Sequence, residues 1–471
     1  MFPSILTFDF DLSLGLFRLL ILKTFELVIL NLWGHLLSSD SLQFGYKAKT
    51  STIHCTWLVS EVVQHMLRGG INPILTVLDC SKAFDKCKFS ILFNRLLDKG
   101  LPPIVVRIIV FIYTEQFCWV KWGDSKSSFF KVTNGTRQGA ILSPFFWAVY
   151  ADPLISRLRS LGVGVHIGGL FMGCVLYADD LLLIAPSRSA MQRMLEEINA
   201  FAKEVNITFS SDEDPNKSKS KCIFVIGKKA NITKPAPLML GDHQLPFVSK
   251  AEHLGNILSE SGDMELDASS KRAKFIQSAV ETRELFKWAP PEEIIWATKV
   301  YSSSFYGSEL WDLGGGKANQ VYKSWNTAVK LAWGCPQQTR TYILQNMLSC
   351  GFSSARVDIL SKFVSFFKSL RYSASKEVQV LSRLVSRDVR SCTGKNLLLL
   401  QELSGLSPWT VSSTRLKQVL MEKEQCQVPI EDQWRLPYLE SLISQRRAAQ
   451  DLALDDLGNY ITELINSLII S

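Results

Sequence analysis

The segment that most constrains the fold is Val175–Ile184, an apolar run that carries two adjacent carboxylates, Asp179 and Asp180. A short apolar run of this kind predicts two buried strands folded back on each other at the aspartates. Burying an unpaired carboxylate is costly, and a neighbouring like charge opposes its ionisation further. The pair therefore predicts a bound divalent cation. A solvated hairpin turn is the alternative that this segment alone leaves open.

Two further segments argue against the solvated hairpin turn. Ile74–Asp79 is a β-type run that ends in a third aspartate, and Cys80–Asp85 follows it directly. Asn134–Pro144 is a loop punctuated by glycines that leads into a helix. Three such segments in this order are far more specific than any one of them.

The three segments resemble the palm of reverse transcriptases of the non-LTR (LINE-type) retrotransposons. The resemblance is carried by Leu78–Asp85, Gly135–Pro144 and Tyr177–Asp180, and Lys217–Phe224 and His253–Asn256 are similar to the last palm motifs of that family. It covers most of residues 40 to 260 and, more loosely, the stretch to about residue 350.

This resemblance implies an α+β fold: a right-hand polymerase palm with partial fingers, built as an antiparallel sheet backed by helices. Periodicity favours helix from about Asp263 onward, as in a thumb and a C-terminal region. The expected parts are an N-terminal helical segment (residues 1–40) and the fingers and palm (residues 41–262). A helical thumb-like region (residues 263–350) and a helical C-terminal extension (residues 351–471) follow.

The activity that the resemblance implies is RNA-directed DNA polymerisation from an RNA template, a DNA primer and deoxynucleoside triphosphates. Two divalent ions can stabilise the attacking and leaving oxygens together. Mg²⁺ prefers carboxylate oxygens, and Mn²⁺ is an alternative ion. The expected metal ligands and catalytic carboxylates are Asp79, Asp179 and Asp180, of which Asp180 can instead act by supporting its neighbour. The backbone carbonyl of Cys80 is an additional ligand implied by the family.

Other residues take roles from the same resemblance. Phe84 stands where the family places the aromatic ring that excludes a ribose 2′-hydroxyl, and a core phenylalanine is the alternative. Arg137, Gln138 and Gly139 are expected to contact the template or the incoming nucleotide, against the alternative of a plain turn. Lys219 resembles the palm lysine that protonates the leaving pyrophosphate, with Lys217 and Lys221 as rivals in a cluster that can also be merely solvated.

The net charge of +8 favours a polyanionic partner only modestly, and the distribution of charge says more. Residues 313–357 contain no Asp or Glu. Basic residues interleaved with aromatic ones are typical of nucleic-acid surfaces. The expected contacts are Lys317, Lys323, Lys330 and Arg340. The alternative is a helical subdomain in which Tyr322, Trp325 and Trp333 are core.

Scattered cysteines without a Cys-x-x-Cys pair indicate a reduced, intracellular protein of the nucleus, the cytoplasm or both. Charged residues interrupt Ile5–Leu37 too often for a membrane span, which favours a packed amphipathic helix around Phe17–Leu37 and no membrane partner. The sequence gives no indication of oligomeric state.

Local signals add further expectations. Pro144 predicts the start of a helix that runs to about Leu161. Ser189 and Gln192 are spaced as a capping box for the next helix. Cys118–Trp122 and Ser128–Val132 predict the arms of a hairpin.

The departures from the family are also informative. About forty residues precede Leu42, fewer than the fingers of the family usually occupy, and an amino-terminal endonuclease has no room. We therefore expect a partial polymerase of retrotransposon origin. The alternative is a catalytically silent RNA-binding remnant that keeps the palm fold. An intron-maturase type of polymerase is disfavoured by the residues within the motifs.

Overall fold

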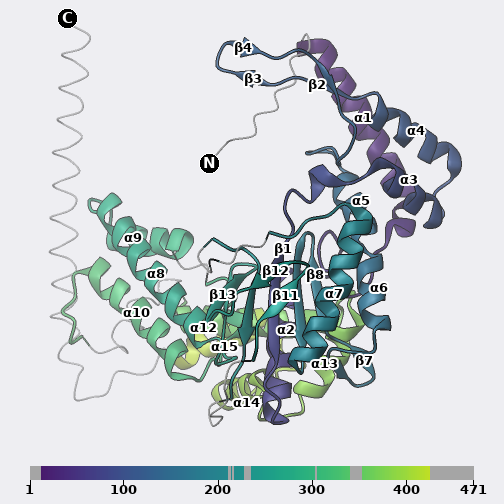
Figure 1. Cartoon of the computed structure of the whole chain (residues 1–471). Coiled ribbons are helices and arrows are strands. Elements are labelled where there is room, and N and C mark those ends of the chain that lie inside the picture. Colours follow the sequence, from purple (N-terminus) through teal and green to yellow (C-terminus); the bar gives the residue numbers. More distant parts are fainter. Residues whose placement is uncertain are drawn as a thin grey trace, which may run out of the picture. The chain divides into compact units, whose positions relative to one another are not determined.

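The computed structural model describes residues 12–210, 214, 217–227, 235–302, 305–339 and 353–424, with side chains described from Leu20 onward. The chain divides into two compact units (Figure 1). The first contains residues 1–262 together with 372–382, and the second contains residues 263–371 together with 383–471.

A four-stranded antiparallel sheet lies at the centre of the first unit, with the strand order β10-β1-β9-β8. Its strands are β1 (Ile74–Asp79), β8 (Cys174–Tyr177), β9 (Asp180–Ala185) and β10 (Lys221–Phe224). Every residue of β1 and β9 is buried except the terminal aspartates, Asp79 and Asp180. Continuous apolar strands require cover on both faces. The two buried strands expected around the aspartates are confirmed.

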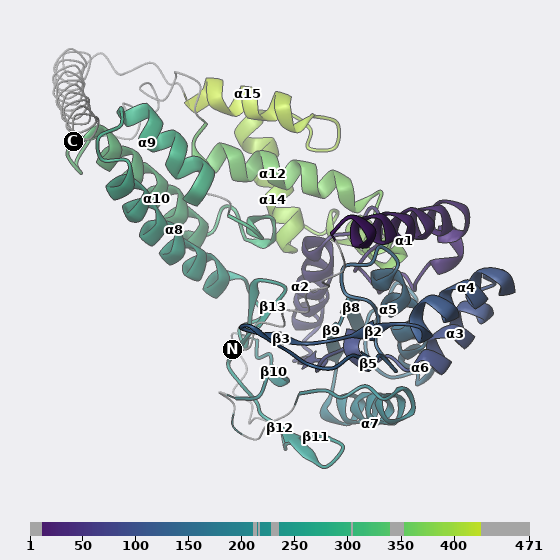
Figure 2. The same ribbon diagram turned by 90° about the horizontal axis from the view of Figure 1, so that it is seen from above.

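Helices supply that cover. Figure 2 shows α2 (Thr52–Arg68) on one side of the strands and α7 (Arg188–Val205) on the other. The apolar face of α7 is buried, including Met194 and Ile198. The helix is capped by Ser187, whose hydroxyl accepts a hydrogen bond from the backbone N–H of Ala190 at 3.2 Å.

The predicted capping box of α7 is wrong. Gln192 instead bonds the backbone of Met239 twice, donating to its carbonyl and accepting from its N–H, each at 3.0 Å. The side chain of Gln192 therefore fixes the segment that contains β11 (Leu238–Leu240) against α7. A long-range contact has replaced the local one.

The helix that begins near Pro144 is shorter than predicted. It is α5 (Ser143–Ala151), and a second helix, α6 (Pro153–Ser160), follows after Asp152. Proline lacks an N–H and its ring clashes with the preceding turn, so Pro153 ends α5 and starts α6.

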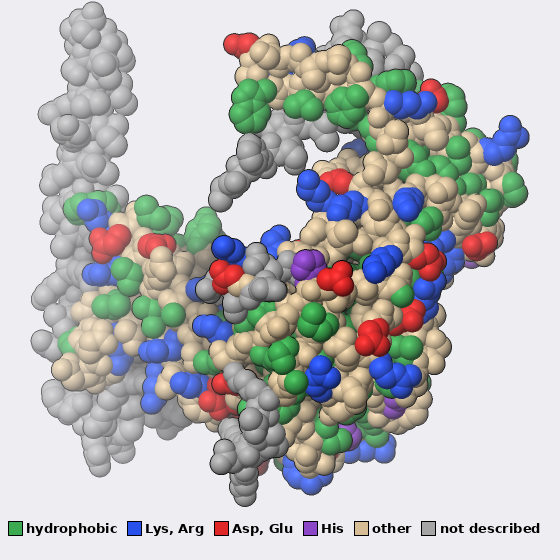
Figure 3. All heavy atoms as spheres, in the orientation of Figure 1, with side chains coloured by type: hydrophobic (Ala, Val, Ile, Leu, Met, Phe, Trp, Pro, Cys, Tyr) green, Lys and Arg blue, Asp and Glu red, His purple; other side chains and the backbone are tan. Residues whose placement is uncertain are grey.

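The remaining elements of the first unit surround this centre. The helical ones are α1 (Leu12–Trp33), η1 (Gly34–Leu37), η2 (Phe84–Lys86), α3 (Phe89–Asp98) and α4 (Pro103–Thr114). Small antiparallel pairs are β2 (Phe117–Cys118) with β5 (Phe130–Lys131), β3 (Lys121–Trp122) with β4 (Ser125–Lys126), β6 (His166–Ile167) with β7 (Leu170–Phe171), β11 with β12 (His243–Leu245), and β13 (Lys250–His253) with β14 (Asn256–Ser259). The expected hairpin near Cys118–Val132 is present as β2 to β5, and apolar side chains are visible along it in Figure 3.

Helix α1 differs from the packed helix that was expected. Ile29 is fully buried, but one side of the helix is open to solvent, with Leu20 63% and Leu27 52% exposed. The stretch Leu20–Leu37 is long and apolar enough to cross a membrane by length and composition, a test that core helices and signal sequences also pass.

The described part of the second unit is helical, as expected from Asp263 onward. It contains α8 (Glu265–Leu285), α9 (Pro291–Ala297), η3 (Thr298–Ser302), η4 (Ser308–Leu310), α10 (Gly316–Trp333), α12 (Ala355–Leu370), α14 (Cys392–Ser404) and α15 (Ser413–Glu424), and α13 (Lys376–Val385) crosses the boundary between the units. Helices α8 and α10 pack together through Phe275 and Trp325, whose ring centroids lie 6.2 Å apart.

Candidate active site

A tight turn joins β8 to β9 and carries the paired aspartates. Ala178 has a φ of +57°, in the left-handed region, and Tyr177 pairs with Asp180 across the turn. A positive φ at the first central residue is typical of hairpin turns that match the twist of their strands. The turn therefore places Asp179 at its tip and Asp180 at the start of β9.

A segment more than a hundred residues upstream supports this turn. The side-chain oxygen of Gln43 accepts hydrogen bonds from the backbone N–H groups of Gly45 at 2.9 Å and Ala178 at 3.1 Å. The backbone of Phe44 and Leu42 also bonds Leu176 in β8. A Cβ atom added at Gly45 would lie 2.5 Å from the Ala178 nitrogen, so only glycine fits there without movement of the turn.

The strand register brings Asp79 next to Asp180, which follows Asp179 in the chain. Asp79 at the end of β1 lies directly opposite Asp180 in β9, so their side chains project from the same face of the sheet. Burial, together with the charges of Asp179 and Asp79, raises the pKa of Asp180 to about 6. Burial and the charge of Asp79 also raise the pKa of Asp179. The three groups therefore form an electrostatically coupled cluster of like charge.

Asp79 is held by the segment that precedes β10. Its backbone N–H donates to the hydroxyl of Ser220 at 3.2 Å, and the ammonium of Lys219 lies 3.7 Å from its carboxylate. Lys217 is 3.9 Å from Asp214 instead, and Lys221 lies within β10 opposite Val77. Of the three rival lysines, Lys219 is the one whose ammonium the structure pairs with Asp79.

The donor set suits a hard divalent cation. Carboxylates with raised pKa values lack a neutralising charge, and Mg²⁺ prefers such oxygen ligands. Within the described residues, no group of three or more His, Cys, Asp or Glu is gathered closely enough to form a ready-made metal cage. The side chain of Cys80 is buried, and burial raises the pKa of its thiol to about 12. Any role of this residue as a ligand therefore falls to its backbone carbonyl.

Phe84 lies five residues after Asp79, in the short helical turn η2. Its ring is partly buried against the core, with its centroid 5.5 Å from that of Trp147. Its carbonyl accepts a hydrogen bond from the N–H of Thr136 at 2.7 Å. The ring is thus fixed on one side by packing and by a backbone bond, while part of its surface stays open.

The glycine-punctuated loop is attached to the same segment. The N–H of Gly135 donates to the carbonyl of Cys87 at 2.8 Å, and Gln138 donates to the carboxylate of Asp85 at 3.2 Å. Gly135 has a φ of +90°, and a Cβ atom there would lie 3.0 Å from the Asp85 carbonyl oxygen. Gly139 is exposed, and Arg137 is partly exposed. Asp85 and Cys87 thus hold the loop against the segment that follows Asp79.

Several residues of this site were not predicted. Gln43 and Gly45 brace the turn, and Ser220 bonds the backbone of Asp79. Glu26 of α1 is buried and accepts a hydrogen bond from the N–H of Ile141 at 2.7 Å, which ties the loop to that helix. A buried glutamate within an apolar helix is a signal that could have been read from the sequence. The bracing by Gln43 has no local signature.

The basic residues predicted to bind nucleic acid lie on and beyond α10. Lys323 is exposed, Lys317 is partly exposed, and Lys330 donates to the carbonyl of Gln337 at 2.7 Å. Arg340 lies outside the described residues. Among the aromatic residues, Tyr322, Trp325 and Trp333 are buried, so in α10 the core alternative holds for the rings.

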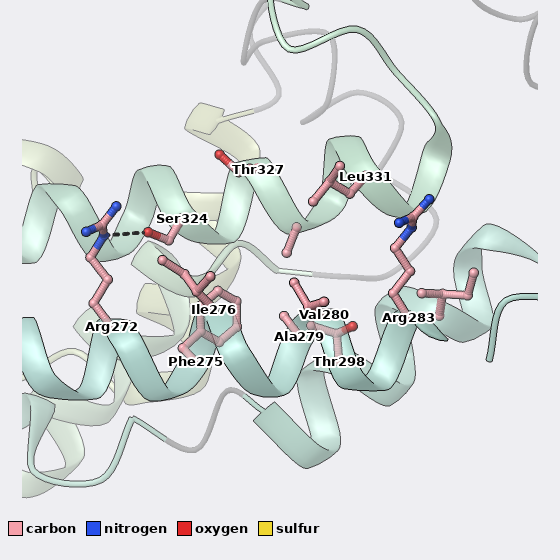
Figure 4. Close-up of a pocket in the computed structure, with 12 residues that line it drawn as sticks. Arg272, Phe275, Ile276, Ala279, Val280, Arg283, Thr298, Ser324, Thr327 and Leu331 are labelled. Atoms are coloured by element: carbon pink, nitrogen blue, oxygen red, sulfur yellow. Dashed lines mark hydrogen bonds between the residues drawn. The ribbon is translucent and has the colours of Figure 1, made fainter. Parts of the chain in front are cut away.

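The second unit also contains an apolar groove between α8 and α10, with a volume of about 130 Å³ (Figure 4). Its wall includes Phe275, Ile276 and Leu331, and Arg272 and Arg283 lie at its two ends. The guanidinium of Arg272 donates to the hydroxyl of Ser324 at 2.8 Å.

Comparisons with known proteins match much of the first unit. The family described as reverse transcriptase (RNA-dependent DNA polymerase) matches residues 11–229. The retrovirus-related Pol polyprotein from type-1 retrotransposable element R2 of Nasonia vitripennis is 23% identical over 250 residues, covering 52% of this chain and 24% of that protein. The corresponding polyprotein from type-2 element R2DM of Drosophila melanogaster is 23% identical over 219 residues, covering 45% of this chain and 20% of that protein.

The chain therefore spans about a quarter of the length of these curated relatives. Among solved structures, telomerase from Candida albicans in complex with a TWJ fragment of telomeric RNA is 11% identical, covers 89% of this chain and 56% of that one, and has a TM-score of 0.35.

Proposed function

We propose that the protein is an RNA-directed DNA polymerase of the non-LTR retrotransposon kind, because residues 11–229 match the reverse transcriptase family and the curated relatives are Pol polyproteins of retrotransposable elements. The observation that carries the proposal is the register that sets Asp79 opposite Asp180, with Asp179 at the adjacent turn. Asp79 ends β1 and Asp180 begins β9, so the proposed metal ligands lie at one edge of the buried sheet.

In the proposed reaction, the 3′-hydroxyl of a DNA primer attacks the α-phosphorus of a deoxynucleoside triphosphate, and pyrophosphate leaves. Two Mg²⁺ ions, or Mn²⁺ in their place, held by Asp79, Asp179 and Asp180 with the carbonyl of Cys80, would stabilise the charge on the attacking and leaving oxygens. Lys219 is the proposed proton donor to the pyrophosphate because its ammonium already lies beside Asp79.

The neighbouring segments are proposed to select the nucleotide. Phe84 follows Asp79 by five residues, and the open part of its ring would exclude a ribose 2′-hydroxyl by steric contact. Arg137 and Gln138 would donate to the template or the triphosphate, while the exposed Gly139 lets the backbone approach them. The bonds from this loop to Phe84 and Asp85 would keep both selecting groups in one rigid frame.

A primer-extension assay on an RNA template tests the proposal. Wild-type protein should extend the primer with Mg²⁺ and stop when EDTA removes the metal. Asp179→Asn should lose at least about a hundredfold in rate because a preorganised charge at the transition state is removed. Asp98→Asn changes an exposed carboxylate at the end of α3 and serves as the matched control.

Extension by Asp179→Asn at the rate of the control would refute the catalytic assignment. If the wild-type protein binds the RNA but extends no primer under any of these conditions, the silent RNA-binding remnant is the correct reading.

A further inference from the structure

The hairpin formed by β2 to β5, residues 117–131, exposes an unusual amount of aromatic surface. We refer to it as the hairpin arm (Figures 1 and 3). The large apolar side chains that it exposes are Phe117 at 50%, Val120 at 46%, Trp122 at 71%, Phe129 at 68% and Phe130 at 46%. Single exposed apolar residues need no explanation, but a cluster of this size on one short element indicates a binding surface.

Lysines alternate with these rings. Lys121, Lys126 and Lys131 are all exposed, and Asp124 is the one acidic residue between positions 117 and 131. Lys131 pairs with Glu115 at 3.1 Å. The hairpin arm therefore combines positive charge with flat apolar surface.

The strand register places two of these lysines next to each other. Lys121 lies directly opposite Lys126 in the β3–β4 pair, so both side chains project from the same face. The Lys126 ammonium also lies over the Trp119 ring, 4.7 Å from its centroid. An anion bound beside the two ammonium groups would be attracted by both. A phosphate group has the charge and the acceptor oxygens to bind in this way.

From these observations we infer that the hairpin arm binds single-stranded RNA, with bases stacked on Trp122 and Phe129 and a backbone phosphate between Lys121 and Lys126. Single strands present the flat faces of their bases, whereas a duplex buries those faces in its own stack. The choice of RNA rests on the proposed function. A protein partner fits less well, because lysine is depleted at protein interfaces.

Binding can be measured apart from catalysis. The probe is a fluorescent oligo-uridine of fifteen nucleotides, titrated with the full chain in EDTA without primer or nucleotide. Trp122→Ala combined with Phe129→Ala should weaken binding at least about fivefold, since each stacked base contributes strongly. The matched control is Phe111→Ala, which truncates a ring that is 66% exposed on α4, outside the arm.

The lysines give a second, independent readout. Lys121→Ala should reduce the slope of log affinity against log salt by about 0.7, the value for one phosphate contact on a single strand. Lys203→Ala removes an exposed lysine of α7 and should leave the slope unchanged. Thermal unfolding should be the same for all these variants because every substituted side chain is exposed.

Cross-linking locates the contact directly. A 4-thiouridine-containing RNA should attach to the tryptic peptides Trp122–Lys126 and Ser127–Lys131, which contain Trp122 and Phe129 and are released by cleavage after Lys121, Lys126 and Lys131. Unchanged affinity and salt slope in the arm variants, or cross-links confined to other peptides, would overturn the inference. A third result would also overturn it. If the wild-type protein self-associates and the Trp122 variant does not, while its RNA affinity is unchanged, the arm is a protein contact. Asp179→Asn should bind the RNA normally, so a failure of catalysis and a failure of the arm give different results.

Discussion

Gly45→Ala should disturb the aspartate turn without touching a catalytic group. The new Cβ would lie 2.5 Å from the Ala178 nitrogen and 3.2 Å from both the Ala178 Cα and the side-chain oxygen of Gln43. Carbon and nitrogen atoms in contact lie about 3.5 Å apart or more, so the turn has to withdraw by about 1 Å.

Two consequences follow from this displacement. Overpacking of a well-packed site costs about 1 to 3 kcal/mol in the free energy of unfolding. The withdrawal also carries Asp179 away from Asp79, and a misplacement of about 1 Å at a catalytic centre reduces rate on the order of a hundredfold. The rate should therefore fall much further than the affinity for primer and template.

The assay is single-turnover primer extension with urea unfolding measured in parallel. Gly316→Ala is the control because a Cβ atom at that glycine meets no heavy atom within 4 Å. The unfolding measurement remains informative even if extension is slow. If Gly45→Ala matches the wild-type protein in both rate and stability, the turn does not pack against residue 45 and the account of the site is wrong.

Three further predictions concern the same groups. Burial and the neighbouring carboxylates raise the pKa of Asp180 in the folded protein from 3.8 to about 6. The folded, metal-free protein therefore binds a proton at Asp180 more tightly than the unfolded chain does. The stabilisation that this proton gives is lost as pH rises through about 6. Asp180→Asn should therefore raise the unfolding free energy at pH 7 by about 1 to 2 kcal/mol after allowance for solvent screening, and equal stability at pH 7 would contradict the charge coupling. Phe84→Ala should increase ribonucleotide incorporation relative to deoxynucleotide in a competition assay, whereas an unchanged ratio together with a large loss of stability would make the ring purely structural. If α10 contacts phosphates, Lys323→Glu should weaken binding to a primer–template duplex and reduce the salt dependence of that binding. Trp325→Ala should mainly lower the free energy of unfolding, by about 3 to 5 kcal/mol, because that ring is buried. Wild-type affinity and salt slope in the Lys323→Glu protein would show that α10 is not part of the binding surface.

The positions of the carboxylates could be predicted because strand ends have a strong local pattern. Asp79 and Asp180 each adjoin an apolar run that predicts a buried strand, and the antiparallel register sets them opposite each other. Gln43 and Gly45 could not be assigned in this way because their partner, Ala178, lies 135 residues from Gln43 along the chain. No local periodicity encodes such a contact.

The errors have the same physical origin. Gln192 has the spacing of a capping residue, yet its two bonds to Met239 satisfy donor and acceptor together. The sequence leaves open whether Trp325 and Trp333 face nucleic acid or the core, and the packing of α8 against α10 buries them. For the hairpin arm, the sequence predicts the paired strands but not the exposure of the aromatic rings. Sequence pattern identifies aromatic residues, whereas tertiary packing decides which of them face solvent.

The strand order β10-β1-β9-β8 also has a consequence for how the protein is made. Neighbouring β1 and β9 are separated by about a hundred residues, and β10 joins the other edge of β1 only after a further helix and loop have been synthesised. Pairings between distant segments form slowly because a long loop must close first. On the ribosome, β1 therefore emerges well before either neighbour, with both of its hydrogen-bonding edges unpaired and an apolar surface uncovered. Such intermediates are prone to aggregation, so we expect the yield of folded protein to depend on slow synthesis or on chaperones that shield β1.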